Sequence, residues 1–291
     1  MNRLRRWLRG PPPEAMAGRL FVPPGHFYSP IPDPAEAGAR LARKMPDALP
    51  DITIDRAAME HLWVNLTGHM AGCDFPERAA PAHRYYFEND FFSYADALVL
   101  HAMLRWLRPA RVMEVGSGFS SAAMLDTRER HGAPGRLTCI DPAPERLRGL
   151  LRDGDASQCE VLARKVQDVD TGLFASLTRG DMLFIDSAHV LKTGNDLHHV
   201  LFEILPVLAP GVVVHFHDVF WPFEYPADWV LGEQRAWNEA YALRAFLAGN
   251  AMFEILFFND YFARLQREAM LAAHPFIGRN TGGSLWLRKT R

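Results

Sequence analysis

The segment 111–121, RVMEVGSGFSS, constrains the fold more than any other part of the chain. In it an apolar run ends at the glycine turn Gly116–Gly118, and helix-forming residues follow. This order predicts a buried strand, a tight turn whose backbone can approach a ligand, and a helix whose N-terminus points at that ligand. A second apolar run, 137–140, ends at Asp141, where an acidic side chain can hydrogen-bond a ribose. Together the two segments indicate a site for a nucleoside cofactor.

Two features of the turn favour S-adenosylmethionine (SAM) over a dinucleotide. The third glycine of the dinucleotide pattern is replaced by Ser121, and Glu114 lies two residues before the turn. A carboxylate repels a pyrophosphate, whereas it suits SAM, which carries an ammonium and a sulfonium but no phosphate. We expect Asp141 to bind the ribose hydroxyls and Asp168 to lie near the adenine amino group. The residues expected to contact SAM are Glu114, Gly116, Ser117, Gly118, Ser120, Ser121, Asp141, Asp168 and Asp186.

The bulk composition argues against several functional classes. The chain has 291 residues, of which 48% are hydrophobic and 23% charged, as in ordinary globular proteins. Its formal net charge of −2 gives no overall attraction to nucleic acid or to an anionic membrane. The three cysteines form no C-x-x-C pair, which argues against a zinc site or a disulfide framework. No apolar run reaches about eighteen residues, so we expect no stable membrane insertion. Together with the net charge, this leads us to expect a cytoplasmic protein with no nucleic-acid partner.

The chain divides into an N-terminal extension and a larger domain. Residues 1–50 are rich in proline and predict an extended arm with short helices. Apolar residues at helical spacing then predict a helix over 55–68. The expected domains are a proline-rich arm and helix over 1–80 and a cofactor-binding domain over 81–291. Because aromatic residues interleave with the prolines in FVPPGHFYSPIP, 21–32, we expect the arm to pack onto this domain.

Strands and helices alternate regularly from residue 111 onward. Strands are expected over 111–115, 136–141, 158–164, 181–186 and 211–217. Helices are expected over 119–130, 143–152, 171–178, 194–208 and 233–248. Strict alternation of apolar strands with helices is typical of a parallel sheet covered on both faces. Two further strand-like runs, 252–258 and 284–288, complete a doubly wound, mostly parallel, seven-stranded sheet, so the expected fold class is α/β.

Polar residues follow the ends of the fourth and fifth strands. Ligands of open α/β sheets bind beyond the carboxyl ends of the strands. The fourth strand ends in FIDSAH, with Asp186 and His189, and the fifth ends in HFHDVFW, with His217 and Asp218. Polar groups at successive strand ends, next to a run as apolar as 182–185, indicate a convergent site.

These two strand ends resemble those of the cation-dependent O-methyltransferases of the catechol and caffeoyl-CoA type. In a gapless alignment of 211–221, His217 stands where that family has an aspartate ligand, and Asp218 where it has an asparagine ligand. Asp186 stands at the acidic ligand of strand four, and His189 at the catalytic lysine. The resemblance implies a divalent cation held by Asp186, His217 and Asp218. It also implies that Asp186 and His189 are catalytic, with His189 as the general base. Because a histidine replaces an oxygen ligand, Mn²⁺ or Fe²⁺ becomes as reasonable as Mg²⁺.

A wider stretch, 85–225, resembles the class I SAM-dependent methyltransferases of the bacterial methyltransferase-24-like group. The resemblance rests on YFENDFFSYADA, EVGSGFSSAAMLD, FIDSAHVLKTGND and HDVFWPFEYP. It implies SAM as the cofactor and a Rossmann-like sheet with an antiparallel last strand. Methyl transfer to a hydroxyl group is implied by the resemblance to the O-methyltransferases above. Because the sequence shows no basic groove for nucleic acid, the expected acceptor is a small molecule or a glycan-type metabolite.

Three alternative functions stay open on the sequence alone. A NAD-dependent oxidoreductase would share the fold, although Glu114 and Ser121 count against it. A catalytically silent SAM-binding module would keep the turn without needing aligned polar strand ends. A metal-dependent hydroxylase on the same fold would use the mixed histidine and carboxylate set for iron chemistry. Assembly into a homo-oligomer is compatible with all of them.

Overall fold

The structure is a computed structural model that describes residues 21–291. Residues 1–20, which include Pro11–Pro13 of the expected arm, lie outside the described residues. The chain forms two compact units. One contains residues 46–224 and 237–291, and the other contains the described residues 21–45 and 225–236. The domain boundary expected after residue 80 stays a prediction.

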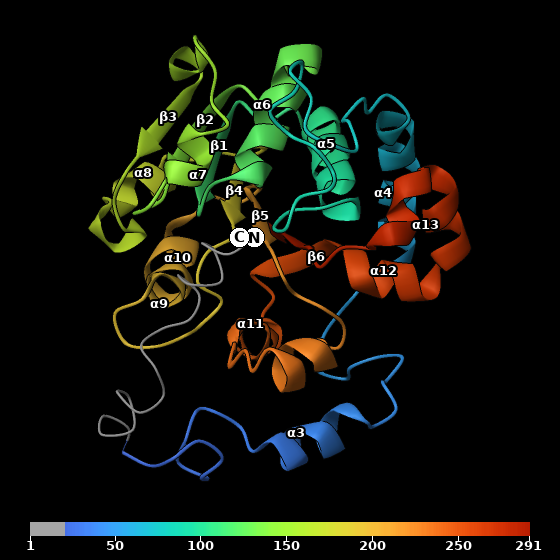
Figure 1. Cartoon of the computed structure of the whole chain (residues 1–291), viewed down its shortest axis with the longest axis vertical. Helices are drawn as coiled ribbons and strands as arrows, with labels where there is room; N and C mark the ends of the chain where they lie inside the picture. The colour runs from blue at the N-terminus through green and yellow to red at the C-terminus, as the bar shows by residue number, and fades with distance from the viewer. Residues whose placement is uncertain (1–20) are drawn as a thin grey trace. The chain divides into compact units, whose positions relative to one another are not determined.

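The larger unit contains a seven-stranded sheet with the order β3-β2-β1-β4-β5-β7-β6 (Figure 1). The strands are β1 (Arg111–Val115), β2 (Arg136–Ile140), β3 (Cys159–Leu162), β4 (Met182–Ile185), β5 (Val213–Phe216), β6 (Phe253–Phe258) and β7 (Leu285–Lys289). The first five strands pair in parallel, while β7 runs antiparallel to both β5 and β6. The predicted α/β fold with a doubly wound, mostly parallel sheet is therefore confirmed.

The middle of the sheet is apolar, and this is why it lies in the core. Every residue of β4 and β5 is buried, and so are the last four residues of β1. Burying a large aliphatic or aromatic side chain contributes about 1.5–3 kcal/mol to the free energy of unfolding. The strand order reverses between β1 and β4, and the carboxyl ends of these two strands are where an open sheet of this kind binds its ligand.

Helices cover the sheet on both sides. On one side α5 and α6 pack against each other and α4 packs against α5, while α8, η3 and α10 lie together on the other side (Figure 1). The helices of the larger unit are α4 (Arg56–Met70), α5 (Ala95–Leu107), α6 (Phe119–His131), α7 (Glu145–Arg148), η1 (Asp155–Ser157), η2 (Val166–Asp168), α8 (Thr171–Ala175), α9 (Asp196–His199), η3 (Val200–Ile204), α10 (Leu205–Val207), α11 (Glu239–Leu247), α12 (Asn259–Leu265), α13 (Arg267–Ala273) and η5 (Pro275–Arg279).

Three of the expected helices differ from the structure. The helix expected over 143–152 is limited to α7, Glu145–Arg148. The region 194–208 is divided into α9, the π-helical η3 and α10, and Pro206, which lacks a backbone N–H, stands in its last turn. The helix expected over 233–248 begins only at Glu239. Residues 233–236, expected in this helix, belong to the smaller unit, whereas α11 belongs to the larger one.

Among its described residues, the smaller unit contains two short helical segments, α3 (Pro34–Leu41) and η4 (Asp228–Gly232), which contact each other. Asp33 caps α3, since its Oδ1 accepts hydrogen bonds from two backbone N–H groups of the first turn. Phe27 and Tyr28 form a ring cluster whose side chains are exposed. The expected packing of the arm onto the larger domain stays a prediction.

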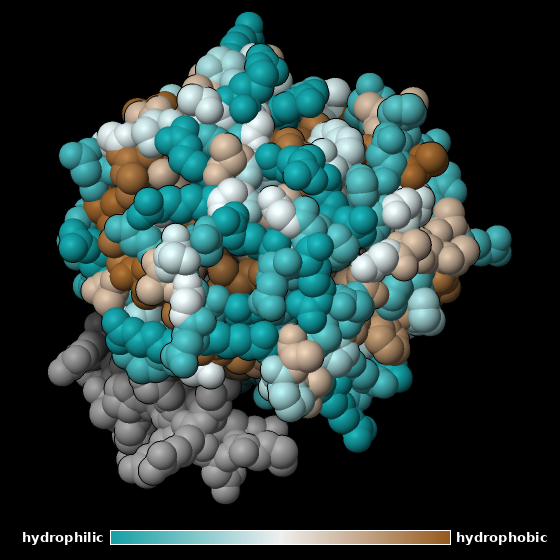
Figure 2. Space-filling view, turned by 90° about the horizontal axis from the view of Figure 1, so that it is seen from above, coloured by the Kyte–Doolittle hydropathy of each residue, from teal (hydrophilic) through white to brown (hydrophobic). Residues whose placement is uncertain are grey.

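The surface is largely polar. Figure 2 shows one face of the molecule, on which hydrophilic residues predominate and hydrophobic ones lie in small, separate groups. Across the described part of the chain, no helix is both long and apolar enough to span a membrane.

Candidate functional site

The glycine turn after β1 is held against the end of β4. Gly116 has a φ of +82°, a left-handed conformation that glycine adopts without strain. A Cβ atom at this position would lie 1.7 Å from the carbonyl oxygen of Asp186, so a larger residue would displace the end of β4. The backbone N–H of Asp186 donates to the carbonyl oxygen of Val115, 2.9 Å away. The turn and Asp186 are therefore fixed together at one edge of the sheet.

Asp141, directly after β2, closes the turn from the other side. Its Oδ2 accepts hydrogen bonds from the backbone N–H of Ser117 at 3.0 Å and from Ser117 Oγ at 2.9 Å. Its Oδ1 accepts from the N–H of Ala143 at 2.8 Å. Because each carboxylate oxygen has more than one acceptor position, the half-buried Asp141 can still accept hydrogen bonds from ribose hydroxyls. The ribose contact expected of Asp141 stays a prediction.

Glu114 is buried below the glycine turn and is hydrogen-bonded within the protein. The side chain is completely buried, and its Oε1 accepts from Ser120 Oγ at 2.5 Å. Its Oε2 accepts from Ser121 Oγ and from the Cys139 thiol, the latter at 3.2 Å. Burial raises the pKa of Glu114 to about 7, although these three donors oppose the shift. Glu114 therefore anchors the first turn of α6, and its direct contact with SAM stays a prediction.

An arginine that the sequence analysis did not single out lies beside the turn. The guanidinium of Arg146, in α7, stands over the ring of Phe91, 3.5 Å from the ring centre. A Cβ atom at Gly118 would lie 2.9 Å from Arg146 Cδ, which shows how close the arginine stem is to the turn. Burial lowers the pKa of Arg146, and the charges of Asp186 and Asp141 oppose this shift. No sequence signal distinguishes this arginine from the others of the chain.

A cluster of polar side chains lies where β4 and β5 end. His189 is in its middle, with Nε2 3.6 Å from Asp186 Oδ1 and 3.6 Å from Asp218 Oδ2. His217 joins through its Nε2, which lies 3.5 Å from Asp218 Oδ1. Both histidines are buried, whereas the side chains of Asp186 and Asp218 keep 22% and 18% of their surface exposed. The cluster is therefore open to solvent on its carboxylate side.

The other nitrogen of His189 contacts a residue that sequence reasoning missed. His189 Nδ1 lies 2.7 Å from Oε2 of Glu239, the first residue of α11, and Glu239 is buried. The two residues are fifty positions apart, and a glutamate at the start of a helix is ordinary, so the sequence carries no signal for this pair. We call Asp186, His189, His217, Asp218 and Glu239 the His189 cluster.

The cluster favours the charged form of both histidines. Burial by itself opposes the charge on His189, but the hydrogen bond to Glu239 and the charges of Glu239, Asp218 and Asp186 outweigh it and raise the pKa to about 9. For His217 burial is again opposed, here by Asp218, Asp186 and Asp96, and the pKa is raised to about 8. Burial raises the pKa of Glu239, which the hydrogen bond to His189 counteracts.

Two residues of the cluster have a strained backbone. His189 has a φ of +55° and Asp218 a φ of +58°, both in the left-handed region that residues other than glycine rarely adopt. Such strain costs on the order of 1–3 kcal/mol per residue and persists only where the surroundings enforce it. The surrounding structure therefore holds both side chains in defined positions.

The expected cation ligands lie close together at the ends of β4 and β5. Between residues 21 and 291, no group of three or more His, Cys, Asp or Glu side chains is arranged to hold a metal ion. Nε2 of His189 lies 3.6 Å from one oxygen of Asp186 and 3.6 Å from one oxygen of Asp218. The divalent cation expected from the sequence therefore stays a prediction.

The structure brings most of the expected site residues to one edge of the sheet, in two groups. The first surrounds the glycine turn with Glu114, Gly116, Ser117, Gly118, Ser120, Ser121 and Asp141. The second is the His189 cluster, and Asp186 belongs to both because its carbonyl abuts Gly116. Asp168 is exposed in η2 and, within the described residues, makes no hydrogen bond or ion pair with either group.

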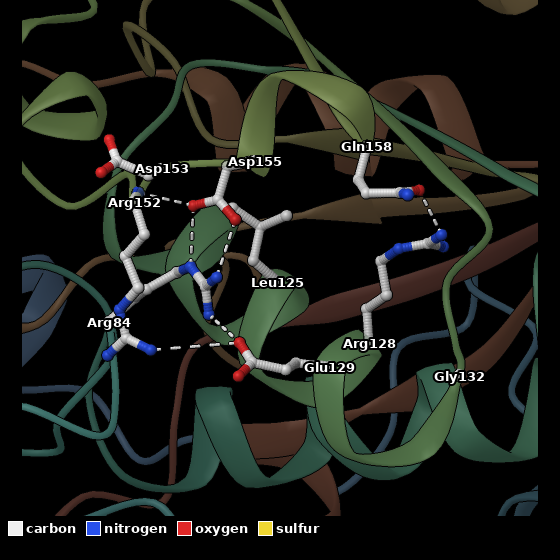
Figure 3. A pocket seen from close by; sticks show the side chains of 10 residues that line it. Arg84, Leu125, Arg128, Glu129, Gly132, Arg152, Asp153, Asp155 and Gln158 are labelled. Atoms are coloured by element: carbon white, nitrogen blue, oxygen red, sulfur yellow. Dashed lines mark hydrogen bonds and ion pairs between the residues drawn. The ribbon is translucent and has the colours of Figure 1, made fainter.

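A second charged region surrounds a pocket near the C-terminal end of α6 (Figure 3). The guanidinium of Arg84 donates hydrogen bonds to Asp155 and Glu129 there, and Arg128 points toward Gln158. Arg152, also at this pocket, donates to the carbonyl oxygen of Pro81 at 2.8 Å. All three arginines are thus engaged within the protein.

Comparison with known proteins agrees with the site. A family model described as a methyltransferase domain, of the methyltransferase-24 group, matches residues 113–219. An uncharacterized protein of Archaeoglobus fulgidus is 32% identical over 181 residues, which cover 58% of this chain and 79% of that protein.

Solved structures with a similar fold include two methyltransferases. The O-methyltransferase TomG of Streptomyces achromogenes, in complex with SAM, has a TM-score of 0.40 and 18% identity, covering 82% of this chain and 92% of that one. The methyltransferase PaMTH1 of Podospora anserina, bound to S-adenosylhomocysteine (SAH), has a TM-score of 0.42 and 14% identity, covering 88% and 95%.

The family assignment rests on three agreeing observations. The sheet is seven-stranded and mostly parallel with an antiparallel β7, as expected from the sequence. The glycine turn after β1 and the acid after β2 stand side by side. The matched methyltransferase model spans both of them and continues to the end of β5. This chain belongs to the class I SAM-dependent methyltransferases.

Proposed function

We propose that this protein transfers a methyl group from SAM to a hydroxyl group of a small-molecule or glycan-type acceptor, with His189 as the proton acceptor. The observation that carries the proposal is the position of His189. Its Nε2 faces Asp186 and Asp218 on the open side of the cluster, and its Nδ1 is engaged by Glu239. A histidine held in this way has one nitrogen available for an acceptor hydroxyl.

The residues around the glycine turn are proposed to hold SAM. Asp141 would accept hydrogen bonds from the ribose hydroxyls, and Asp186 would contribute at the end of β4. When bound, SAM supplies a methyl group on a positively charged sulfur. The carboxylates of Asp186 and Asp218 are the groups that would face the acceptor, since they form the exposed side of the His189 cluster.

His189 is proposed to take the proton that the acceptor hydroxyl loses. The neutral ring, which is the main form only above the raised pKa of about 9, accepts this proton at Nε2, while the proton on Nδ1 stays on the hydrogen bond to Glu239. Glu239, Asp186 and Asp218 then stabilise the imidazolium that results. A positioned general base of this kind contributes about 10²–10⁴-fold to a rate.

The proposal is tested by methyl transfer from isotopically labelled SAM to a panel of hydroxylated small molecules and sugars. We expect labelled product with the wild-type protein and about 10²–10⁴-fold slower transfer with His189→Gln. His198→Gln is the matched control, because His198 is an exposed histidine on α9 and should keep full activity. SAH affinity, measured by calorimetry, should be the same in all three proteins.

Two outcomes would overturn the proposal. No transfer to any hydroxyl of the panel, despite SAH binding, would favour a silent SAM-binding module. Full activity of His189→Gln would show that another group takes the proton. The divalent cation expected from the sequence remains a separate prediction, and none of the roles above depends on it.

A further inference from the structure

We propose that Glu239 is a positioning residue that fixes the ring orientation of His189. The inference rests on the proposed function, because it explains how one nitrogen of His189 is kept available. Its basis is the contact between Oε2 of Glu239 and Nδ1 of His189, 2.7 Å apart, in a pair that is almost entirely buried.

The backbone around His189 needs support from outside its own loop. With a φ of +55°, this residue is in a conformation that costs free energy, and it follows β4 by only four residues. The support comes from the start of α11, where the backbone N–H groups of Asn238 and Glu239 both donate to the carbonyl oxygen of His189 at 3.2 Å. The strained residue is thus tied directly to the helix that carries Glu239.

The neighbouring residues strengthen the same connection. Asn238 Oδ1 accepts from the N–H of Leu191 at 2.5 Å, and Asn238 Nδ2 donates to the carbonyl oxygen of Leu191 at 3.3 Å. The ring of Trp237 packs on the imidazole of His189, with 4.3 Å between the ring centres. The segment 237–239 therefore holds the backbone of the His189 loop at two points and covers one face of the ring.

The carboxylate of Glu239 decides which nitrogen faces the site. A buried carboxylate without a partner is costly, so Glu239 requires a proton donor at Nδ1. A 180° rotation of the ring about the Cβ–Cγ bond would put carbon Cδ2 opposite Glu239 and carbon Cε1 opposite Asp186 and Asp218, and would break the hydrogen bond to Glu239. The hydrogen bond thus selects the arrangement in which Nε2 faces the open side of the cluster.

The experiment is proton NMR of the whole protein with ¹⁵N-labelled histidine. A buried N–H donating to a carboxylate over 2.7 Å should give a low-field resonance outside the amide region. The absence of this resonance in His189→Gln assigns it to the His189 ring. We expect the resonance to be lost in Glu239→Leu and shifted upfield in Glu239→Gln, whose neutral side chain is a weaker acceptor. Glu203→Leu is the matched control, since Glu203 contacts Nδ1 of another histidine, His199, at 3.3 Å.

Methyl transfer separates positioning from a purely structural role. In Glu239→Leu we expect kcat to fall at least about tenfold with little change in the KM for SAM. Glu239→Gln should have a kcat between those of Glu239→Leu and the wild type. A low-field resonance that persists in Glu239→Leu would overturn the inference, as would a wild-type kcat in that variant. Should Glu239→Leu not fold, an unshifted resonance in Glu239→Gln would overturn it. The NMR result is independent of any acceptor, so it stands even if the proposed function fails.

Discussion

Two buried groups of charged side chains in the larger unit use similar residues in opposite ways. One is the His189 cluster at the carboxyl ends of β4 and β5. The other, which we call the Arg84 cluster, consists of Arg84, Asp126, Glu129 and Asp155 and borders the pocket of Figure 3.

The Arg84 cluster is saturated with short hydrogen bonds. Arg84 donates to both oxygens of Asp155 at 2.9 and 2.7 Å, to Asp126 at 2.8 Å and to Glu129 at 2.5 Å. The second oxygen of Asp126 accepts from the backbone N–H groups of Arg84 and Tyr85. Burial opposes the charge of Arg84, but these carboxylates raise its pKa well above the usual value. The guanidinium of Arg84 is thus bound by carboxylates of the protein itself and not by a ligand.

The His189 cluster leaves part of its hydrogen-bonding capacity unused. The contacts of His189 Nε2 to its two carboxylates are 3.6 Å long, and buried His217 Nδ1 has no hydrogen-bond partner among the described residues. The backbone is also strained at two residues of this cluster, His189 and Asp218. The difference teaches that a saturated charge cluster serves stability, whereas an unsaturated one can serve binding and chemistry.

The largest expected effect comes from breaking the saturated cluster. Arg84→Met would leave Asp126 and Asp155 buried without their cation, so we expect the free energy of unfolding to fall by about 3–5 kcal/mol. Urea denaturation measures this loss. Arg136→Met is the control, since the Arg136–Glu160 pair is exposed and is worth about 0–1 kcal/mol. An equal, small loss in both variants would contradict the comparison.

A smaller effect, on binding, is expected at the glycine turn. Asp141→Ala removes the acceptor of the two Ser117 hydrogen bonds and of the proposed ribose contacts, and should weaken SAH binding by about 1–3 kcal/mol. Calorimetric titration with SAH checks it. Asp153→Ala, an exposed aspartate at the pocket of Figure 3, should leave the affinity unchanged. Unaltered affinity in Asp141→Ala would remove this residue from the cofactor site.

Acidification should show how much the Arg84 cluster contributes to the free energy of unfolding. The hydrogen bonds and charge of Arg84 outweigh burial and lower the pKa of Asp155 below its usual value. A depressed carboxyl pKa contributes stability above the unfolded-state value, near 3.9, and loses it as the pH falls through the lower folded-state value. We therefore expect the free energy of unfolding to decline with acidification in this range, with a shallower slope in Arg84→Met. Parallel slopes in the two proteins would argue against this assignment.

The smallest effect is expected from removing metal ions. Because none of the roles proposed for Asp141, Asp186 and His189 uses a metal ion, we expect dialysis against a chelator to leave SAH affinity and methyl transfer unchanged. The measurement is activity before and after chelation, and again after adding Mg²⁺, Mn²⁺ or Fe²⁺. Activity that disappears and returns with one of these ions would reinstate the cation predicted from the sequence.

The sequence alone determined the fold class and the neighbourhood of the site. Apolar runs predict β1–β5 because parallel strands buried on both faces are mostly apolar, with Glu114 and His215 as buried polar exceptions. Gly116 and Asp141 could be located because a tight turn and a strand-end acid leave local signals at a fixed spacing. The polar ends of β4 and β5 were visible for the same reason.

Only the tertiary structure decided how these residues are used. Glu114 is predicted from the sequence to contact SAM, and the structure adds that it is buried and accepts hydrogen bonds from three donors of α6 and β2. His189 is predicted to be the general base, and folding adds its 3.6 Å contacts to Asp186 and Asp218 and brings Glu239, fifty residues away, onto its other nitrogen. Local patterns record which backbone conformations are favoured, whereas the partner and protonation of a buried polar group depend on contacts between residues distant in the chain.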